Sequence, residues 1–364
     1  MSLNADSVAH SQEAILRRMR EEITAICERA PQVWEECLRH AARSAMTPTT
    51  TVLAGCGDSY YAGLAMRPVL EALIEHPVIS WPAMDVVSYP SRILNDADLV
   101  AVSVSGKVGR TIDAVDLHNA RGGATFAVTA YPDSDLARTA DAAIPTGVRG
   151  TPGPVPGTAN YVASLLGLLA FGVVRGGAQR PGVEDAVPAV LAELPSILER
   201  ATDFFDDVVT SLSEPVFAVG SGPDWGTANF AVAKLLEAAG AVGVPQDLEE
   251  WAHEQYFATR DDRTVLVIGH EEVAAQAARQ VIDMATAVGG RTIAIGQDFG
   301  ASAKHAFDLP GTPPGLSPLV TWLPVAVLAL TFAQRHGRVP FGIDRAGRME
   351  TVDKNIYIAA PSRA

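Results

Sequence analysis

The sequence predicts an α/β protein with two doubly wound parallel sheets, and three observations support this fold class. Short apolar runs alternate with helical segments along most of the chain, which is typical of a parallel sheet covered by helices on both faces. A strand, a glycine-containing turn and a helix follow one another in this order twice, which indicates an internal duplication. With 364 residues and a hydrophobic content of 48%, the chain is long enough to build two such cores.

Residues 1–45 are expected to form an N-terminal helical arm. Within a helical pattern that covers residues 11–45, Ile15, Met19 and Ile23 recur at the spacing of one helix face. Because proline has no backbone N–H and clashes with the preceding turn, we expect this helix to break at Pro31.

The first α/β domain is expected over residues 46–180. A glycine-rich break at residues 175–177 ends its alternating pattern, and residues 181–212 are predicted to form a helical connector. The apolar runs of this domain predict strands at 51–55, 78–80, 99–103, 125–129 and 142–145.

The second α/β domain is expected over residues 213–340, and residues 341–364 are expected to form a C-terminal tail that contributes to the active site. The order of the first domain repeats here, with a strand at 216–219, a helix at 227–240 and strands at 264–268 and 292–295. This repetition is the basis for the predicted duplication.

Composition excludes several classes of partner. A formal net charge of -14 argues against nucleic acid and anionic membranes, because the average field repels both. The apolar stretches 161–174 and 319–333 are too short or too interrupted by proline to span a bilayer, so we interpret them as core helices. The three cysteines, without metal-ligand spacing, and the lack of a signal peptide fit a reducing cytoplasm. No metal or cofactor is expected.

Two strand-to-helix loops carry the chemical signal of the sequence. The first is AGCGDSYYAG at residues 54–63, and the second is AVSVSGKVGRT at residues 101–111. Each places serine hydroxyls where a helix begins, and a helix N-terminus offers unpaired N–H groups and a positive dipole end. Together the loops predict a site for a small sugar with an anionic group. A dinucleotide site is disfavoured, because the third glycine of that fingerprint is missing.

These loops resemble those of the sugar isomerase (SIS) domain family, specifically the two-SIS-domain isomerase half of glucosamine-6-phosphate synthase. The family writes them as Cys-Gly-Thr-Ser-Tyr and Ser-Gln-Ser-Gly-Glu-Thr, where this chain has residues 56–60 and 103–108. Four further matches follow in order: Glu22-Ile23 before a proline, Lys234-x-x-Glu237, His253 sixteen residues beyond that glutamate, and Lys354 before an apolar tail. The resemblance implies a flavodoxin-like fold for both domains. The glutamine-hydrolysing domain of that enzyme has no counterpart here, so we expect no use of glutamine as ammonia source.

The resemblance also implies roles for three catalytic residues. Glu237 would move a proton between C1 and C2 of the sugar, although it also fits a solvated helix residue paired with Lys234. His253 would open the sugar ring, reaching the active site of a neighbouring subunit in a homodimer, although a surface histidine is the plainer interpretation. Lys354 would bind or polarise the open-chain carbonyl, although it also fits an exposed lysine of the tail.

Substrate binding is assigned to residues of both domains, and here the chain departs from the family. Val104 and Val108 replace the family's glutamine and threonine, which removes two hydrogen-bond donors to the anion. Lys107, in place of the family's glutamate, and Arg110 add positive charge, unless both face solvent. Asp58, in place of a threonine, either contacts the sugar or caps the helix. The substrate-binding prediction comprises Gly57, Asp58, Ser59, Ser103, Val104, Ser105, Lys107, Val108, Thr111 and Lys234.

The sequence therefore predicts a cytoplasmic enzyme that interconverts the aldose and ketose forms of a hexose with an anionic C6 group. A phosphate or a less demanding sulfonate both fit the altered loops. Deamination of an amino-sugar phosphate, or deglycation of a fructosamine phosphate, uses the same residues and remains open. A non-catalytic sugar-phosphate sensor is a third alternative. At the strand end where the first domain has its Ser-x-Ser-Gly turn, the second domain has Gly269-His270-Glu271-Glu272, so we expect one ligand site in each chain.

Overall fold

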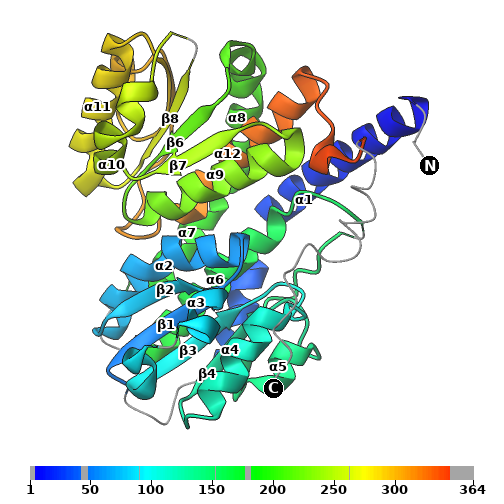
Figure 1. Ribbon diagram of the computed structural model, residues 1–364, viewed down its shortest axis with the longest axis vertical. Coiled ribbons are helices and arrows are strands. Elements are labelled where there is room, and N and C mark those ends of the chain that lie inside the picture. Colours follow the sequence, from blue (N-terminus) through cyan, green and yellow to red (C-terminus); the bar gives the residue numbers. More distant parts are fainter. Residues whose placement is uncertain are drawn as a thin grey trace. The chain divides into compact units, whose positions relative to one another are not determined.

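The computed structural model describes residues 5–41, 48–89, 91–151, 153–176, 182–261 and 263–344, and these form two compact units (Figure 1). One unit contains Arg29–Gly150 and Ala159–Ala189 and carries the first sheet. The other contains residues 5–28, Thr151–Thr158 and residues 190–344 and carries the second sheet. Both sheets are parallel throughout and have helices packed on them, so the predicted fold class is confirmed.

The first sheet has the strand order β2-β1-β3-β4-β5. Its strands are β1 (Thr50–Gly55), β2 (Val78–Pro82), β3 (Ala97–Val102), β4 (Thr125–Thr129) and β5 (Ala142–Pro145). The connecting helices are α2 (Asp58–Ile74), α3 (Ala83–Ser88), η1 (Arg92–Asp96), α4 (Gly109–Asn119) and α5 (Asp135–Thr139), and α6 (Ala159–Gly176) follows β5. The five strands that the sequence predicts in this domain are all present.

Continuous apolar runs place β1 and β3 in the middle of this sheet, because a central parallel strand is covered on both faces. Every residue of β3 is buried, including Asp98, whose carboxylate accepts a 3.1 Å hydrogen bond from Arg175 of α6. Helix α6 packs against α2, and a Cβ at Gly172 would lie 2.3 Å from Cδ2 of Leu70. Glycine therefore sets how closely these two helices approach.

The second sheet repeats the first. Its order is β10-β9-β8-β6-β7, which, counted from its own first strand, is the order of the first sheet. The strands are β6 (Val216–Val219), β7 (Gly243–Gln246), β8 (Thr264–Gly269), β9 (Arg291–Gly296) and β10 (His305–Asp308). The helices are α9 (Pro223–Ala239), α10 (Leu248–His253), η4 (Gln255–Ala258), α11 (Glu272–Ala287), η5 (Gly300–Ser302), α12 (Pro318–Arg335) and η6 (Pro340–Gly342).

The duplication extends to the lengths of equivalent helices. Helices α2 and α9 each have 17 residues, and α6 and α12 each have 18. As α2 packs on α6, so α9 packs on α12, where the hydroxyls of Thr227 and Thr321 are 2.9 Å apart in the buried interface. The predicted internal duplication is therefore confirmed at the level of topology. The helical connector also forms, as α7 (Val183–Ala192), α8 (Leu194–Val208) and η3 (Val209–Ser211).

The predicted break of the N-terminal helix at Pro31 is wrong. Helix α1 runs unbroken from Ala5–His40 with Pro31 inside it. A proline removes one helical hydrogen bond, but buried side chains on both sides of it hold this helix in place. These are Met19, Ile23, Ile26 and Cys27 before the proline and Val33, Trp34 and Cys37 after it.

Strands β7 and β10 are absent from the sequence prediction, and both lie at edges of the second sheet. Strand β7 has only four residues, two of which are Gly243 and Pro245, and both residue types are unfavourable in strands but tolerated at edges. Strand β10 is equally short and includes His305 and Asp308. Neither strand has an apolar run long enough to be recognised.

Helices α6 and α12 are long and apolar enough to cross a membrane by length and composition alone. However, 72% of the apolar window of α6 and 89% of that of α12 are buried inside the protein. Both are core helices, as predicted.

Candidate functional site

The two sequence motifs meet at one edge of the first sheet. In the order β2-β1-β3-β4-β5 the chain changes direction between β1 and β3, and ligands of such folds bind outside the carboxyl ends of the strands at this point. The motif at residues 54–63 spans the β1–α2 connection, and the motif at residues 101–111 spans the β3–α4 connection. The fold therefore brings the two loops to the place where a ligand is expected.

Glycines shape the β1–α2 loop. Gly57 adopts a φ of 55°, and a Cβ at Gly55 would lie 2.8 Å from the backbone carbon of Ser59. The first turn of α2 thus lies directly against the end of β1, with Ser59 8% exposed. Gly57 is the N-cap of α2, so the alternative that Asp58 is the N-cap residue is wrong. Asp58 lies in the first turn instead.

The β3–α4 loop presents an unsatisfied buried hydroxyl. Ser103 is 3% exposed, and within the described ranges its Oγ has no hydrogen-bond partner. A buried polar atom without a partner costs free energy, so a ligand that accepts from this hydroxyl would recover it. Next to it, Ser105 Oγ accepts a 3.2 Å hydrogen bond from the N–H of Lys107.

The same loop is held by the following strand and turn. The carbonyl of Val104 accepts hydrogen bonds from Ala130 N at 3.0 Å and from Thr129 Oγ1 at 3.2 Å. Gly106 has a φ of 61°, and a Cβ there would lie 2.2 Å from Ser134 Oγ. Sequence reasoning did not identify Thr129 and Ser134 as supports of this site, because no motif marks a contact between separate loops.

The start of α4 adds a second helix N-terminus at this edge. Val108 is the N-cap and its side chain offers no cap, while its carbonyl accepts hydrogen bonds from the N–H groups of Thr111 at 3.0 Å and Ile112 at 3.1 Å. Thr111 is fully buried, with its Oγ1 3.9 Å from Cys56 Sγ of the β1–α2 loop. Valine at position 108 thus provides neither a capping hydroxyl nor a side-chain donor for an anion.

The two basic residues of the loop differ in environment. Lys107 is exposed, whereas Arg110 is buried with 8% exposure in the first turn of α4. The interpretation that both face solvent holds for Lys107 and is wrong for Arg110. Both residues belong to the segment where α4 begins, and positive charge at a helix N-terminus favours an anionic ligand.

Glu237 and Lys234 lie in the other unit, on α9. The side chain of Lys234 is 0% exposed, and its Nζ lies 2.5 Å from Glu237 Oε2 and 5.3 Å from the ring centre of Phe230. The side chain of Glu237 is 32% exposed. The pair is therefore not a solvated surface pair: a buried ammonium fixes the position of a carboxylate that solvent or substrate can reach.

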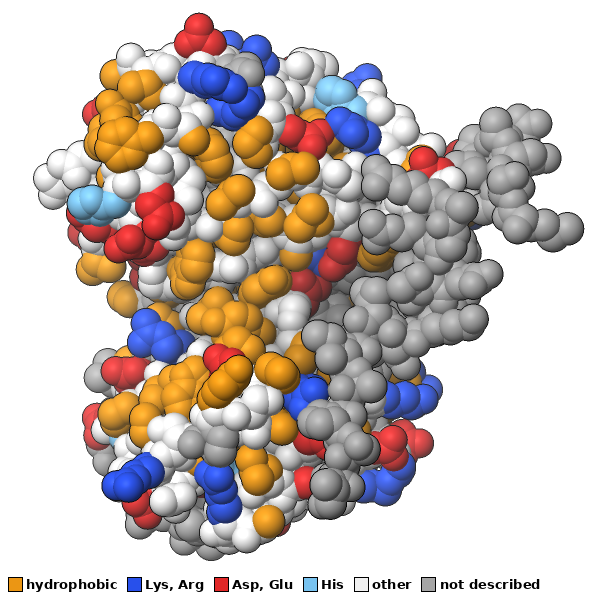
Figure 2. All heavy atoms as spheres, viewed as in Figure 1, with side chains coloured by type: hydrophobic (Ala, Val, Ile, Leu, Met, Phe, Trp, Pro, Cys, Tyr) orange, Lys and Arg blue, Asp and Glu red, His pale blue; other side chains and the backbone are white. Residues whose placement is uncertain are grey.

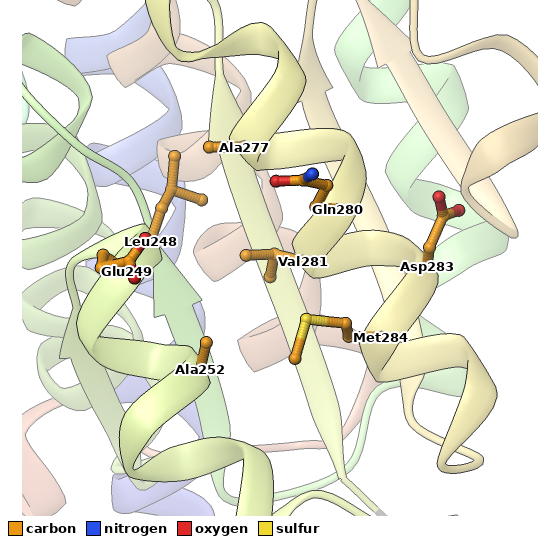
Figure 3. A pocket seen from close by; sticks show the side chains of 8 residues that line it. All are labelled: Leu248, Glu249, Ala252, Ala277, Gln280, Val281, Asp283 and Met284. Atoms are coloured by element: carbon orange, nitrogen blue, oxygen red, sulfur yellow. The ribbon is translucent and has the colours of Figure 1, made fainter.

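His253 is the last residue of α10 and has an exposed side chain, with Nε2 3.4 Å from Glu249 Oε1. This position agrees with the surface interpretation and also with a role at an interface. Lys354 lies outside the described residues. A groove of about 460 Å³ runs beside this helix, between α10 and α11 (Figure 3).

This groove is a poor site for an anionic sugar. Figure 3 shows Glu249 and Ala252 of α10 on one side and Gln280, Val281 and Asp283 of α11 on the other. Two carboxylates and no basic side chain line it, so its field repels anions. The switch point of the first sheet is the stronger candidate.

Comparison with known proteins agrees with this geometry. Residues 48–173 match the model of the SIS domain family. These residues, which include all five strands of the first sheet, form an SIS domain. Glutamine–fructose-6-phosphate aminotransferase (isomerizing) of Zymomonas mobilis is 27% identical over 302 residues, which cover 78% of this chain and 49% of the relative. The chain thus spans about half the length of that relative, and the resemblance inferred from its motifs is confirmed.

Solved structures share the SIS fold. A glucosamine-6-phosphate deaminase from Thermotoga maritima superimposes with a TM-score of 0.71 at 16% identity, covering 88% of this chain and 96% of its own. A tagatose-6-phosphate ketose/aldose isomerase from Escherichia coli gives a TM-score of 0.66 at 18% identity, covering 93% and 96%. At these identities the comparison establishes the fold.

The equivalent point of the second sheet, between β6 and β8, contains carboxylates. Asp224 of α9 is fully buried, and its Oδ2 accepts hydrogen bonds from the N–H groups of His270 at 2.8 Å and Glu271 at 3.5 Å. Glu271 accepts in turn from Gly315 N, at 3.1 and 3.2 Å to its two oxygens. Sequence reasoning placed no site here and did not single out Asp224. Across the described ranges no three His, Cys, Asp or Glu side chains form a group fit to hold a metal ion.

Asp224 makes the stability of the protein depend on pH. Burial raises the pKa of Asp224 from 3.8 to about 6, and the charge of Glu271 adds to this, while the N–H groups of His270 and Glu271 and the Ser317 hydroxyl oppose it. The folded protein therefore holds this proton more tightly than the unfolded chain does. The resulting stability is fully present below pH 3.8 and is lost as the pH rises through about 6.

Asp224→Asn, which cannot titrate, isolates this effect. Between about pH 4 and pH 7, the free energy of unfolding of the variant should rise relative to wild type by up to about 3 kcal/mol. Urea unfolding at a series of pH values measures this difference, with the exposed Asp207→Asn as control. A difference between Asp224→Asn and wild type that does not change with pH contradicts the assignment.

Proposed function

We propose that this SIS-domain protein is an isomerase that interconverts the aldose and ketose forms of a hexose carrying an anionic C6 group. The observation that carries the proposal is the buried hydroxyl of Ser103, without a partner in the described parts of the chain, at the switch point between two helix N-termini. The solved structures of similar fold include a sugar-phosphate ketose/aldose isomerase. We place the reaction in the cytoplasm, as composition suggests.

We call the half of the duplication that carries the first sheet the first copy, and the half that carries the second sheet the second copy. In this proposal the first copy binds the anion. The hydroxyls of Ser59, Ser103 and Ser105, with the first-turn N–H groups of α2 and α4, supply the donors. Lys107 contributes positive charge in place of the donors that Val104 and Val108 lack. A sulfonate, with one negative charge, needs fewer donors than a phosphate with nearly two, so both are candidate C6 groups.

The chemistry is assigned to residues of the second copy and the tail. Glu237 removes a proton from C1 of the ketose and returns it to C2 of the enediol, and the reverse reaction follows the same steps. Lys234 positions the Glu237 carboxylate. His253 gives and takes the proton that opens and closes the sugar ring, and Lys354 polarises the open-chain carbonyl.

Deamination of an amino-sugar phosphate is the second candidate, because the fold is also that of a glucosamine-6-phosphate deaminase. Such a reaction would use the same carboxylate to move the same proton and would release ammonia. Deglycation of a fructosamine phosphate would proceed similarly. A regulator would bind the sugar phosphate without turning it over.

A substrate panel distinguishes these functions. Hexoses and hexosamines with a C6 phosphate, a C6 sulfonate or a neutral C6 group are incubated with the protein, and isomerisation and ammonia release are followed separately. Isomerisation of the anionic hexoses, with much slower turnover of the neutral ones, supports the proposal. Ammonia release without isomerisation identifies the second candidate, and binding without turnover identifies a regulator.

Ser103→Ala should raise the KM for the anionic hexose by about 10- to 100-fold, because a hydrogen bond to a charged group is worth about 1.5–3 kcal/mol. The kcat should change little, since the hydroxyl is assigned to binding. Ser164→Ala is the matched control, because Ser164 is also a buried serine of the first unit but lies on α6 with its hydroxyl bonded to Asn160 O at 2.9 Å. Equal KM values for Ser103→Ala and wild type would remove Ser103 from the anion site.

We also propose that the protein acts as a homodimer with His253 contributed across the interface. Large apolar side chains are exposed in the unit that contains His253: Phe257 of η4 is 80% exposed, and Val242 and Leu236 are 54% and 47% exposed. Figure 2 shows exposed apolar side chains on the face that it draws. Covering such side chains by a second subunit stabilises a dimer.

Mixing two inactive variants tests this arrangement. His253→Ala and Glu237→Gln chains should each be nearly inactive alone and should regain activity when subunits exchange, because one of the two mixed sites receives both intact residues. The activity of the mixture is measured after unfolding and refolding the chains together, with each variant refolded alone as control. Failure to regain activity, when both variants form dimers, contradicts the shared site.

A further inference from the structure

The second copy retains the backbone of the loop that begins the anion site in the first. Gly220 and Gly222 stand at the end of β6 as Gly55 and Gly57 stand at the end of β1, and Gly222 has a φ of 59° against 55° at Gly57. The turn hydrogen bond from Ser59 N to Cys56 O, at 3.3 Å, has its counterpart from Asp224 N to Ser221 O, at 3.1 Å. Asp224 therefore stands where the first copy has Ser59.

The strand registers extend this equivalence to the second loop. Ala54 pairs with Ala101 in the first sheet, and Val219 pairs with Val267 in the second. Counting forward from these pairs, Gly269, His270 and Glu271 correspond to Ser103, Val104 and Ser105. The N–H groups of His270 and Glu271 thus correspond to those of Val104 and Ser105, in the loop that carries the proposed anion site of the first copy.

In the second copy these N–H groups already donate hydrogen bonds to a carboxylate of the protein itself. The carboxylate of Asp224 accepts from both of them, and Asp224 is fully buried. A second carboxylate, that of Glu271, stands in place of a serine hydroxyl and binds Gly315 N, which fixes the segment between β10 and α12 over the loop. Any added anion would have to displace one carboxylate and approach another.

We propose that the second copy contains a closed anion site whose ligand is its own Asp224 carboxylate. This inference rests on the proposed anion site of the first copy, because it compares the two. The expected single ligand site in each chain then has a simple cause. The second copy has Asp224 where the first has Ser59, and Glu271 where the first has Ser105, while the N–H groups of His270 and Glu271 are kept. The ligand class that an opened site would accept is a phosphate or sulfonate group.

The double variant Asp224→Ser and Glu271→Ser, which copies Ser59 and Ser105 into the second copy, tests the proposal. With inorganic phosphate as the probe, isothermal titration calorimetry should give one phosphate per wild-type chain and two per variant chain. Adding Ser103→Ala should weaken one of the two and leave the other unchanged. A folded double variant that binds no more phosphate than wild type overturns the proposal. If wild type binds none and the double variant binds one, the first-copy site fails and the closed site stands.

If the double variant does not fold, a second experiment tests whether an added anion can replace the Asp224 carboxylate. Asp224→Ala leaves a hole beside the N–H groups of His270 and Glu271, so its lowered Tm should rise saturably with added acetate or phosphate, at least twice as much as the Tm of wild type. Ile282→Ala, at a fully buried position of α11 in the same unit, is the matched control and should gain no more than wild type. Equal gains for Asp224→Ala and Ile282→Ala contradict an internal anion.

Discussion

Replacing Glu237 by glutamine is expected to lower kcat for the isomerisation by about 10²- to 10⁴-fold, the usual contribution of a positioned general base. Glutamine keeps the size of the side chain and an oxygen that can accept from Lys234 Nζ, now 2.5 Å from the carboxylate. The amide cannot take up a proton from the sugar, so binding should stay nearly intact while turnover is lost. Steady-state kinetics and direct titration with the anionic hexose measure the two quantities separately.

Glu199→Gln, an exposed glutamate of α8 in the same unit, is the control and should keep wild-type turnover. Because Glu237→Gln removes the charge opposite a fully buried ammonium, its thermal unfolding is recorded alongside. Undiminished turnover in a folded Glu237→Gln protein would exclude Glu237 as the group that moves the proton.

Replacing Lys234 by methionine is expected to have the second largest effect, because it removes the buried cation that holds the Glu237 carboxylate. Without a positive charge at 2.5 Å, the carboxylate binds a proton more readily. The acidic limb of the kcat profile should therefore move to higher pH, and kcat near neutral pH should fall. A lysine that served only to fill the core would change stability without moving this profile.

The two substitutions should also be coupled in stability. Glu237→Gln leaves a buried ammonium without its carboxylate, whereas Lys234→Met with Glu237→Gln leaves neither charge. We expect a coupling free energy of about 0.5–3 kcal/mol in the double-mutant cycle, measured by urea unfolding. Additive effects would mean that the contact between the two side chains contributes nothing to stability.

The central strands could be predicted from sequence because a strand buried on both faces needs a continuous apolar run, as in Leu99–Val102. Edge strands carry no such constraint, and β7 and β10, with Pro245 and Asp308, were not recognised. The predicted helix break at Pro31 was wrong because it used only the local effect of proline on a helix. The buried side chains that hold α1 together were not part of that prediction.

Some features of the candidate site could likewise be predicted from sequence, and others could not. The meeting of the two loops follows from sequence, because the carboxyl ends of neighbouring parallel strands share one edge of the sheet. The burial of Arg110, the support of Val104 by Thr129 and the role of Asp224 depend on contacts between loops far apart in the chain. A comparison of the two copies residue by residue, with Gly-Ser-Gly-Pro-Asp set against Gly-Cys-Gly-Asp-Ser, would have marked Asp224.

Isomerisation of a hexose 6-phosphate in deuterium oxide, followed by proton NMR, tests the central claim most directly. A proton carried between C1 and C2 by a carboxylate exchanges with solvent, so the account predicts aldose and ketose in equilibrium with deuterium at the carbon that receives the proton. The label and the turnover should both disappear in Glu237→Gln. A protein that binds C6-phosphorylated and C6-sulfonated hexoses but interconverts none of them, and exchanges no proton, would contradict the account.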